Sequence, residues 1–381
     1  MENDLTVVLT LRGRHLYTLR WLWYANKIKF PYHIIIADGE VNPTIERLLS
    51  DSSTFSNLSY EYCRYIDITF SDFYKKCTDV VRKVKTKYVV LSDNDDFPII
   101  TGLKKCISQL NNKSEYVCAG GEIPSFSITN KNILDGQIIG SDIDTEFGYL
   151  YQKEDNIDLP IFEQIINQIK NHKVHYYNVY RTEKLEIIFS DIEKLDFSDL
   201  VVHEVFAALR AISLGKVLTD HSIINYYRQR GTSSFFNINQ DLKWLHAFLR
   251  GKISRDVNFM ADKLAYEISK NHDVNYSFVK EEILNEYGEL LQQKLSSITL
   301  QQRFKKVYLL LTKIRHIKSL LISWKPSFTN NQDRLLKILA KNTGENTLLF
   351  DEYKDEFSNI HDALKGTDFL QFVKNNADDL T

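Results

Sequence analysis

The stretch YVVLSDNDD, residues 88–96, decides the fold that we predict for this chain. It begins with a nearly unbroken apolar run, and such strands are typical of parallel sheets, which are buried on both faces. Three carboxylates, those of Asp93, Asp95 and Asp96, follow the run directly. Because ligands of open α/β sheets bind at the carboxyl ends of the strands, this stretch predicts a buried strand that ends in an acidic binding site.

The sequence on either side of this stretch alternates between strand and helix patterns. Apolar runs at 6–11 and 32–37 indicate two earlier parallel strands. Helical patterns lie at 16–23, 43–49, 72–84, 100–110 and 200–214, and further strand patterns at 116–119, 216–219 and 222–227. This order predicts a right-handed, mostly parallel sheet of the α/β, Rossmann-like class.

The character of the sequence changes after about residue 237, where strand patterns fade and helical periodicity dominates to the end. We therefore predict an α/β domain at 1–236 and a smaller all-α domain at 237–381. The length of 381 residues agrees with two domains. The region 122–196 is mixed and gives no clear secondary-structure prediction.

Composition excludes several classes of protein. The chain has 48 Lys and Arg against 50 Asp and Glu, with 43% hydrophobic and 26% charged residues, which are ordinary globular values. The net charge of −2 argues against a nucleic-acid partner. The four cysteines form no C-x-x-C pair, so we expect neither a disulfide framework nor a zinc site, and free thiols suit a reducing compartment. With neither a signal-peptide pattern nor an apolar run of about 20 residues, we expect a cytoplasmic protein.

The acidic end of the 88–96 stretch suits a metal. Clustered carboxylates repel one another and lose hydration on burial unless a cation is present. Carboxylate oxygens are typical ligands of Mg²⁺ and Mn²⁺, which keep waters and bridge to substrate phosphates. The alternative is a polar turn, in which Asp and Asn are common. The position directly after an apolar strand favours the metal–diphosphate site.

Two further acidic positions are candidates for chemistry. Asp38 precedes Gly39 at the end of the strand 32–37, where it can accept hydrogen bonds from a base or a ribose, or simply form a turn. Glu204 lies at the start of a helix, where the helix dipole keeps a carboxylate charged and ready to act as a base. The H-E-x-x-H zinc motif fails at Ala207, and no Walker A, dinucleotide or nucleophile-elbow motif occurs.

Taken in order, these segments resemble the GT-A glycosyltransferases, and in particular glycosyltransferase family 2. The resemblance covers residues 4–234. It rests on the opening strand, on Asp38-Gly39, on the stretch 88–96, on HEVFAALR at 203–210 and on YYRQRGTS at 226–233. It implies a GT-A fold and the transfer of a sugar from a nucleotide-sugar donor.

The resemblance also implies roles for single residues. Glu204 occupies the place of the catalytic base, and Asp95 with Asp93 that of the ligands for Mg²⁺ or Mn²⁺. The implied nucleotide-sugar contacts are Thr10, Arg14, Asp38, Asp93, Arg228 and Arg230. Two positions depart from the family: His203 replaces an acidic residue, and Arg230 stands where many relatives carry a metal-binding His. Because Arg pairs with phosphate and cannot ligate a metal, the need for a metal stays open.

The reaction that the resemblance implies is a single displacement. A carboxylate deprotonates the acceptor hydroxyl, a cation or Arg stabilises the leaving diphosphate, and the anomeric configuration inverts. The acceptor would be a glycan or a lipid-linked glycan in bacterial surface polysaccharide synthesis. Two alternatives are a catalytically inactive GT-A scaffold, in view of His203 and Arg230, and a sugar-phosphate nucleotidyltransferase. The latter would need a Gly-rich basic loop, of which Arg12-Gly13-Arg14 is a faint echo.

The C-terminal third contains a basic stretch at 291–332 that has eight Lys and Arg and no Asp or Glu. Its apolar residues recur at helical spacing, so the stretch predicts a basic amphipathic helix. Such a helix suits peripheral binding to an anionic membrane surface at the inner face of the plasma membrane. The alternative is a helix that packs its apolar face on the catalytic domain. The segment from 351 onward is acidic and could pack on the basic stretch or mediate homo-oligomer formation.

Overall fold

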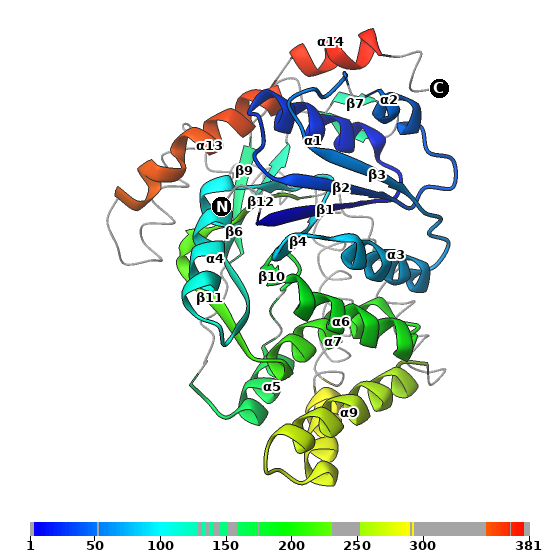
Figure 1. The fold of residues 1–381 in the computed structure, drawn as a ribbon, viewed down its shortest axis with the longest axis vertical. Helices are drawn as coiled ribbons and strands as arrows, with labels where there is room; N and C mark the ends of the chain where they lie inside the picture. Colours follow the sequence, from blue (N-terminus) through cyan, green and yellow to red (C-terminus); the bar gives the residue numbers. More distant parts are fainter. Residues whose placement is uncertain are drawn as a thin grey trace, which may run out of the picture.

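The computed structural model describes residues 4–51, 53–128, 132–134, 137–139, 145–150, 158–171, 173, 175–230, 252–289, 292, 348–365 and 367–376. Within these ranges the side chains at 127–150 and at 201, 230, 252, 348–351, 365 and 367 are not described. The model is a mixed α/β structure built on a large twisted sheet (Figure 1). The predicted α/β class is therefore confirmed.

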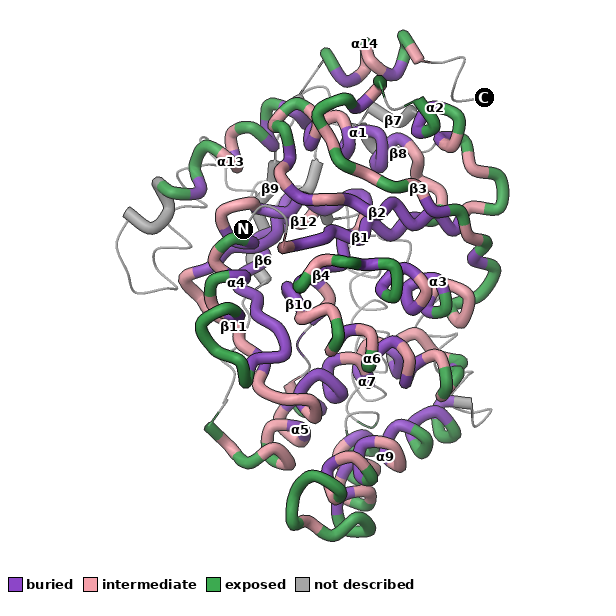
Figure 2. Tube along the Cα trace, viewed as in Figure 1, coloured by how far each residue is buried: buried purple, intermediate pink, exposed green. Residues whose placement is uncertain are grey.

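Four parallel strands form the first half of the sheet. In spatial order these are β3 (Tyr60–Arg64), β2 (His33–Asp38), β1 (Leu5–Leu11) and β4 (Tyr88–Asp93). All seven residues of β1 are buried, and Figure 2 shows β1 and β2 buried along most of their length. Strands covered on both faces need apolar residues at every position, which is why these runs do not alternate with polar residues.

The second half of the sheet is mixed. It continues from β4 through β10 (Val179–Arg181), β6 (Tyr116–Ile128), β12 (Tyr226–Arg230) and β5 (Phe97–Pro98), with β11 (Lys216–Ile224) and β9 (Thr145–Leu150) also paired to β6. The short strand β10 runs antiparallel to both β4 and β6. A separate hairpin joins β7 (Asn132–Leu134) to β8 (Gln137–Ile139).

Helices cover both faces of the sheet (Figure 1). One face carries α1 (His15–Lys27), α2 (Glu46–Ser50), α4 (Ile100–Asn112), α13 (Leu348–Lys365) and α14 (Thr367–Asn375). The other carries α3 (Phe70–Lys83), α5 (Ile161–Lys170), α6 (Thr182–Leu195), α7 (Leu200–Ser213) and α9 (Lys252–Asn271). Successive residues of β1 enter the two cores in turn: Val7 and Leu9 pack in the first, and Val8 in the second.

The predicted elements differ from the structure at four places. The strand predicted at 116–119 runs on to Ile128 as β6. The helix predicted at 43–49 begins only at Glu46 and is five residues long. The strand patterns at 216–219 and 222–227 divide differently, since β11 runs through to Ile224 and β12 begins at Tyr226. The helix that holds Glu204 begins at Leu200, because the Asp199 carboxylate accepts a hydrogen bond from the Val202 amide (3.2 Å). Glu204 therefore lies in the second turn, and the predicted stabilisation by a helix N-terminus does not apply there.

The described residues beyond 237 add to the same two cores. The helix α9 packs on α7, and α13 packs on α1 and α4. The Glu356 carboxylate accepts hydrogen bonds from the first amides of α4, those of Ile100 (2.6 Å) and Thr101 (2.9 Å). The predicted boundary at 236/237 and the basic stretch 291–332 lie outside the described residues, apart from Gln292.

None of the helices in the described part of the chain combines the length and the apolarity that a bilayer crossing requires.

Candidate functional site

Several predicted site residues meet at the carboxyl edge of the parallel strands. Thr10 pairs in register with Ala37 on one side and with Asp93 on the other, and Leu11 pairs with Asp38. The ends of β1, β2 and β4 therefore lie side by side. The predicted contacts Thr10, Asp38 and Asp93 share this edge because the three strands are parallel and in register.

The acidic cluster, defined here as Asp93, Asp95 and Asp96, lies at the end of β4. One carboxylate oxygen from each residue lies within 4.8 Å of the other two. The Asp93 carboxylate accepts hydrogen bonds from the hydroxyls of Tyr176 (3.2 Å) and Tyr177 (3.1 Å). The turn that follows β4 thus folds three carboxylates onto one point, as the sequence predicted.

Backbone and ring donors hold Asp96 in place. Its carboxylate accepts hydrogen bonds from the Tyr177 hydroxyl and from the Gln229 amide (2.8 Å). Its carbonyl oxygen accepts a hydrogen bond from the Trp21 indole (3.0 Å). Residues of α1, of β12 and of the segment before β10 therefore hold Asp96 in place by hydrogen bonds.

Burial and mutual repulsion shift the titration of the cluster. Burial raises the pKa of the Asp93 carboxyl, and the nearby charge of Asp95 raises it further. Burial also raises the pKa of the Asp96 carboxyl well above its ordinary value, as do the charges of Asp95 and Asp93. Both shifts mean that a negative charge is costly here unless positive charge is supplied.

Two arginines supply part of that charge. Nη1 of Arg14 lies 2.8 Å from Asp95 Oδ2, and Nη2 lies 3.3 Å from Asp95 Oδ1 and 2.8 Å from Asn94 Oδ1. Nε of Arg228 lies 3.7 Å from Asp96 Oδ2. The structure thus brings two of the arginines predicted as nucleotide-sugar contacts to the cluster itself. Arg230 belongs to β12, but its side chain lies outside the described residues.

A third arginine, Arg20, was not predicted. Its side chain is 1% exposed, and burial lowers its pKa to about 10. Nη2 donates to the Gln229 side-chain oxygen (2.5 Å), while Nε and Nη1 have no hydrogen-bond partner among the described residues. Arg20 links α1 to β12, and with it to the amide that binds Asp96. The signal available in the sequence was an arginine between two apolar residues, Leu19 and Trp21, in the predicted helix.

The cluster fits a divalent cation. Three converging carboxylates, two of them with a raised pKa, are a hard oxygen-donor set that Mg²⁺ or Mn²⁺ would stabilise. Asp95 and Asp93 would hold the ion, as the sequence predicted, and Asp96 offers a third oxygen. The described residues bring no other such group of His, Cys, Asp or Glu together.

Asp38 is buried at the end of β2. Its carboxylate accepts hydrogen bonds from the Tyr62 hydroxyl (2.9 Å) and from the Glu40 amide (2.9 Å), and burial raises its pKa. The adjacent Gly39 leaves room for Asp67, since a Cβ at Gly39 would lie 1.9 Å from the Asp67 carboxylate. The glycine that the sequence indicated as a turn is therefore required for close packing at this edge.

Asp67 belongs to a buried ion pair at the same edge. Lys76 on α3 binds its carboxylate, and Nζ of Lys76 also donates to the carbonyl oxygen of Leu11 (3.0 Å). Both side chains are 1% exposed. The pair joins the end of β1 to the loop after β3.

The two members of the His203-Glu204 pair have different surroundings. His203 is 1% exposed, stacks on the Tyr74 ring (4.0 Å between centroids), and places Nδ1 2.7 Å from the Asp199 carbonyl oxygen. Burial lowers its pKa to about 4, so it is neutral near pH 7. Glu204 is half-buried. Burial is the main cause that raises the pKa of the Tyr74 phenol. The charge of Glu204 raises it further, and the charge of Asp93 adds a smaller contribution. Glu204 and the acidic cluster therefore act on one shared side chain.

The tyrosines that bind the acidic cluster were missed from the sequence. Tyr176 and Tyr177 fall in the mixed region 122–196, and their rings meet edge to face. Tyr176 also exchanges a hydrogen bond with the Thr10 hydroxyl (2.8 Å). No motif marks them, because the short antiparallel strand that follows them brings them across the sheet to β4.

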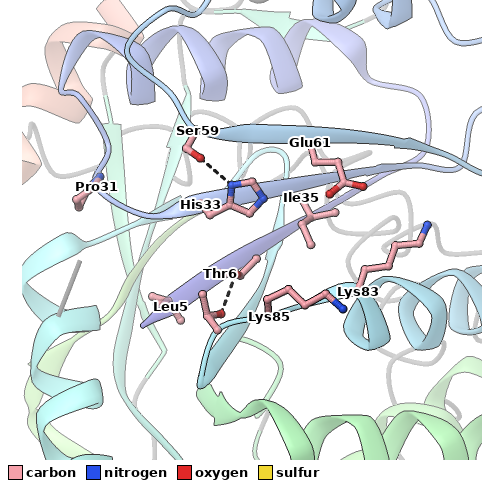
Figure 3. A pocket seen from close by; sticks show the side chains of 10 residues that line it. Leu5, Thr6, Pro31, His33, Ile35, Ser59, Glu61, Lys83 and Lys85 are labelled. Carbon is pink, nitrogen blue, oxygen red and sulfur yellow. Dashed lines mark hydrogen bonds between the residues drawn. The ribbon is translucent and has the colours of Figure 1, made fainter. Parts of the chain in front are cut away.

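A cavity of about 420 Å³ lies at the opposite, amino edge of the strands (Figure 3). His33 and Ser59 share a hydrogen bond on its wall (2.8 Å), and Lys83 and Lys85 flank it. None of the predicted site residues lines this cavity. The candidate site is therefore the carboxyl edge.

No protein-family model and no curated protein sequence matches the chain. Among solved structures it is similar to S. aureus TarS, with a TM-score of 0.45 and 15% identity over 74% of this chain and 42% of that one. Residues 1–349 of TarS in complex with UDP-GlcNAc give a TM-score of 0.43 and 13% identity, over 74% of this chain and 71% of that one. The bifunctional IspDF from Campylobacter jejuni gives a TM-score of 0.28 and 10% identity over 57% and 49%. Likeness at this level assigns neither a family nor an activity to the chain.

Proposed function

We propose that this protein is a glycosyltransferase that moves a sugar from a nucleoside-diphosphate donor to a hydroxyl of its acceptor. The observation that carries the proposal is the acidic cluster at the end of β4, with Arg14 and Arg228 against it. Carboxylates that bind a divalent cation, next to guanidinium groups that bind phosphate, provide complementary charge for a metal–diphosphate. The family resemblance of the sequence supports the same activity.

The donor would lie along the carboxyl edge of the sheet. Asp38 at the end of β2 would accept hydrogen bonds from the nucleobase, and Thr10 on β1 lies between the end of β2 and Asp93 of the cluster. Arg228 would neutralise charge that develops on the leaving diphosphate, and Arg230, on the same strand, would add to it. A divalent cation, when bound by Asp95 and Asp93, would supply further stabilisation of the leaving group.

Glu204 is the proposed base. It is half-buried on α7, and its neighbour His203 is neutral near pH 7, so Glu204 is the one carboxyl group of the pair. A base that removes the acceptor proton while the leaving group departs on the opposite side gives inversion at the anomeric carbon. The acceptor would be a glycan or a lipid-linked glycan in bacterial surface polysaccharide synthesis.

A pair of variants tests the two roles separately. Glu204→Gln keeps the shape of the side chain and removes the base, so sugar transfer should fall about 10²- to 10⁴-fold while donor binding stays unchanged. Asp95→Asn should weaken metal-dependent donor binding about tenfold or more, because a metal ligand loses its charge. Glu186→Gln, an acidic position on α6 with no role in the proposal, is the control for both. Near-normal turnover by the Glu204 variant would reject the base.

Membrane association and self-association are separate proposals. The basic stretch 291–332 would bind an anionic bilayer at the inner face of the plasma membrane, where a lipid-linked acceptor is presented. Co-sedimentation with vesicles that contain anionic lipid should then be lost as salt is raised. Absence of vesicle binding at low salt would reject the membrane proposal. Self-association is tested separately by light scattering, which measures whether the chain forms a homo-oligomer.

A further inference from the structure

We infer that Arg14 is a built-in counter-ion for Asp95, and that it leaves this carboxylate when a divalent cation and a diphosphate bind. The inference rests on the proposed function and adds to it an ordered exchange of charges. The starting point is the geometry of the pair. The guanidinium uses both Asp95 oxygens, at 2.8 and 3.3 Å, so it covers the atoms that a metal would need.

The charges of the cluster show why the pair forms. Three carboxylates converge within 4.8 Å, and in the described part of the chain Arg14 and Arg228 are the cations that form ion pairs with them. The Arg14 pair is short and engages two oxygens, whereas the Arg228 pair spans 3.7 Å. Arg14 is therefore the cation that the described residues place directly against both oxygens of Asp95.

The Arg14 side chain is placed to move. It is 30% exposed, so the guanidinium borders on solvent, whereas the Asp95 side chain is only 7% exposed. Arg14 also has a left-handed backbone, with φ 55°, next to Gly13 with φ 64°. Non-glycine residues seldom adopt this conformation; Arg14 adopts it at the N-cap position directly before α1, and its side chain reaches Asp95 after β4 from there. Turning the side chain outward would break its hydrogen bonds to Asp95 and to Asn94 Oδ1 (2.8 Å).

The exchange balances charge. When a divalent cation takes the Asp95 oxygens, the displaced guanidinium faces the solvent side of the same site, where the diphosphate binds. An arginine fork matches two phosphate oxygens as well as it matches a carboxylate. Metal binding and diphosphate binding then assist each other, since the diphosphate stabilises Arg14 in the position that frees Asp95.

Manganese titrations of the full chain test the inference without a nucleotide. The concentration of free Mn²⁺ is followed by electron paramagnetic resonance, first with the metal alone and then with inorganic diphosphate added. Arg14→Ala should bind Mn²⁺ alone about tenfold or more tighter than the unaltered protein, because a charged hydrogen-bond partner no longer competes. The gain in Mn²⁺ affinity on adding diphosphate should be smaller in the variant.

Two further variants complete the test. Arg12→Ala removes the same charge from an exposed position two residues away, and its Mn²⁺ affinity should stay within about twofold of the unaltered protein. Arg14→Lys keeps the charge, loses the fork and should fall between the unaltered protein and Arg14→Ala. Equal or weaker Mn²⁺ binding by Arg14→Ala, or an equal gain in Arg12→Ala, would overturn the inference. The proposed function fails independently, if no nucleoside diphosphate binds while the Mn²⁺ affinities still differ.

Discussion

Two ion pairs at the carboxyl edge of the sheet differ in how far they are open to solvent. In the Lys76–Asp67 pair both side chains are 1% exposed, and Nζ also binds the Leu11 carbonyl oxygen. In the Arg14–Asp95 pair the arginine is 30% exposed and the aspartate 7%. Two ion pairs near the end of β1, one formed by a lysine and one by an arginine, thus have different surroundings.

The difference in exposure distinguishes an ion pair that stabilises the fold from one that can take part in ligand binding. A closed pair cannot exchange its partner without exposing a buried charge, so it holds the ends of β1 and β3 in place. An open pair can exchange its partner for a ligand at little cost. The more buried pair therefore supports the edge, and the more exposed pair belongs to the candidate site.

The closed pair should give the largest loss of stability. Lys76→Met leaves Asp67 charged and buried without its cation, and the free energy of unfolding should fall by about 3–5 kcal/mol in urea denaturation. The exposed neighbour supplies the control, as Lys75→Met should change the value by less than about 0.5 kcal/mol. Lys76→Met combined with Asp67→Asn should recover part of the loss. A loss below about 1 kcal/mol for Lys76→Met would remove the distinction between the two pairs.

The buried His203 should affect how the stability of the protein depends on pH. The pKa of His203 is about 4 in the folded protein against an ordinary value near 6.5, so the unfolded chain binds the extra proton between these values. The contribution of His203 to stability should be level above about pH 6.5 and fall by about 3 kcal/mol as the pH drops to 4. Denaturation of His203→Phe, which keeps a ring against Tyr74, should show a shallower decline. An identical pH profile in the variant would contradict the buried, neutral histidine.

A carboxylate on α13 gives an intermediate case. Glu356 accepts hydrogen bonds from two amides at the start of α4, so Glu356→Ala should lower the unfolding free energy by about 1–2 kcal/mol. Glu352, one turn earlier, makes an exposed ion pair with Lys105, and Glu352→Ala should cost less than about 1 kcal/mol. Equal losses in thermal or urea denaturation would mean that α13 is held by other contacts.

The open pair should matter least for stability. Arg14→Ala should lower the free energy of unfolding by clearly less than Lys76→Met does, because the guanidinium is 30% exposed and water can replace part of what it contributes. The same urea denaturation measures it beside Lys76→Met. A loss of unfolding free energy as large as that of Lys76→Met would mean that Arg14 also stabilises the fold, and would reject its exchange for a metal.

Much of the edge could be predicted from the sequence because it depends on local patterns. The apolar runs of β1, β2 and β4 fix the parallel strands, and the register then brings Thr10, Asp38 and Asp93 together. The acidic residues that follow β4 needed no tertiary information. The pairing of Arg14 with Asp95 was not foreseen, because the family resemblance implied only a nucleotide-sugar contact for this arginine.

The parts that were missed depend on contacts distant in sequence. Tyr177 reaches Asp96 across 81 positions, and Gln229 reaches it across 133. His203 was interpreted as a replacement for an acidic residue. In the structure it is buried in the core and stacks on the ring of Tyr74 on α3. Neither periodicity nor composition carries this information, since it depends on which helix faces which strand.

The central claim is that the acidic cluster binds a nucleoside diphosphate together with a divalent cation. The most direct measurement is the melting temperature of the full chain with UDP, GDP, ADP, CDP and dTDP, each with and without Mn²⁺, in the unaltered protein and in Asp95→Asn. The account predicts that one nucleotide raises the melting temperature in the presence of Mn²⁺ and that Asp95→Asn loses most of this rise. No rise with any of the five nucleotides, or an equal rise in Asp95→Asn, would contradict it.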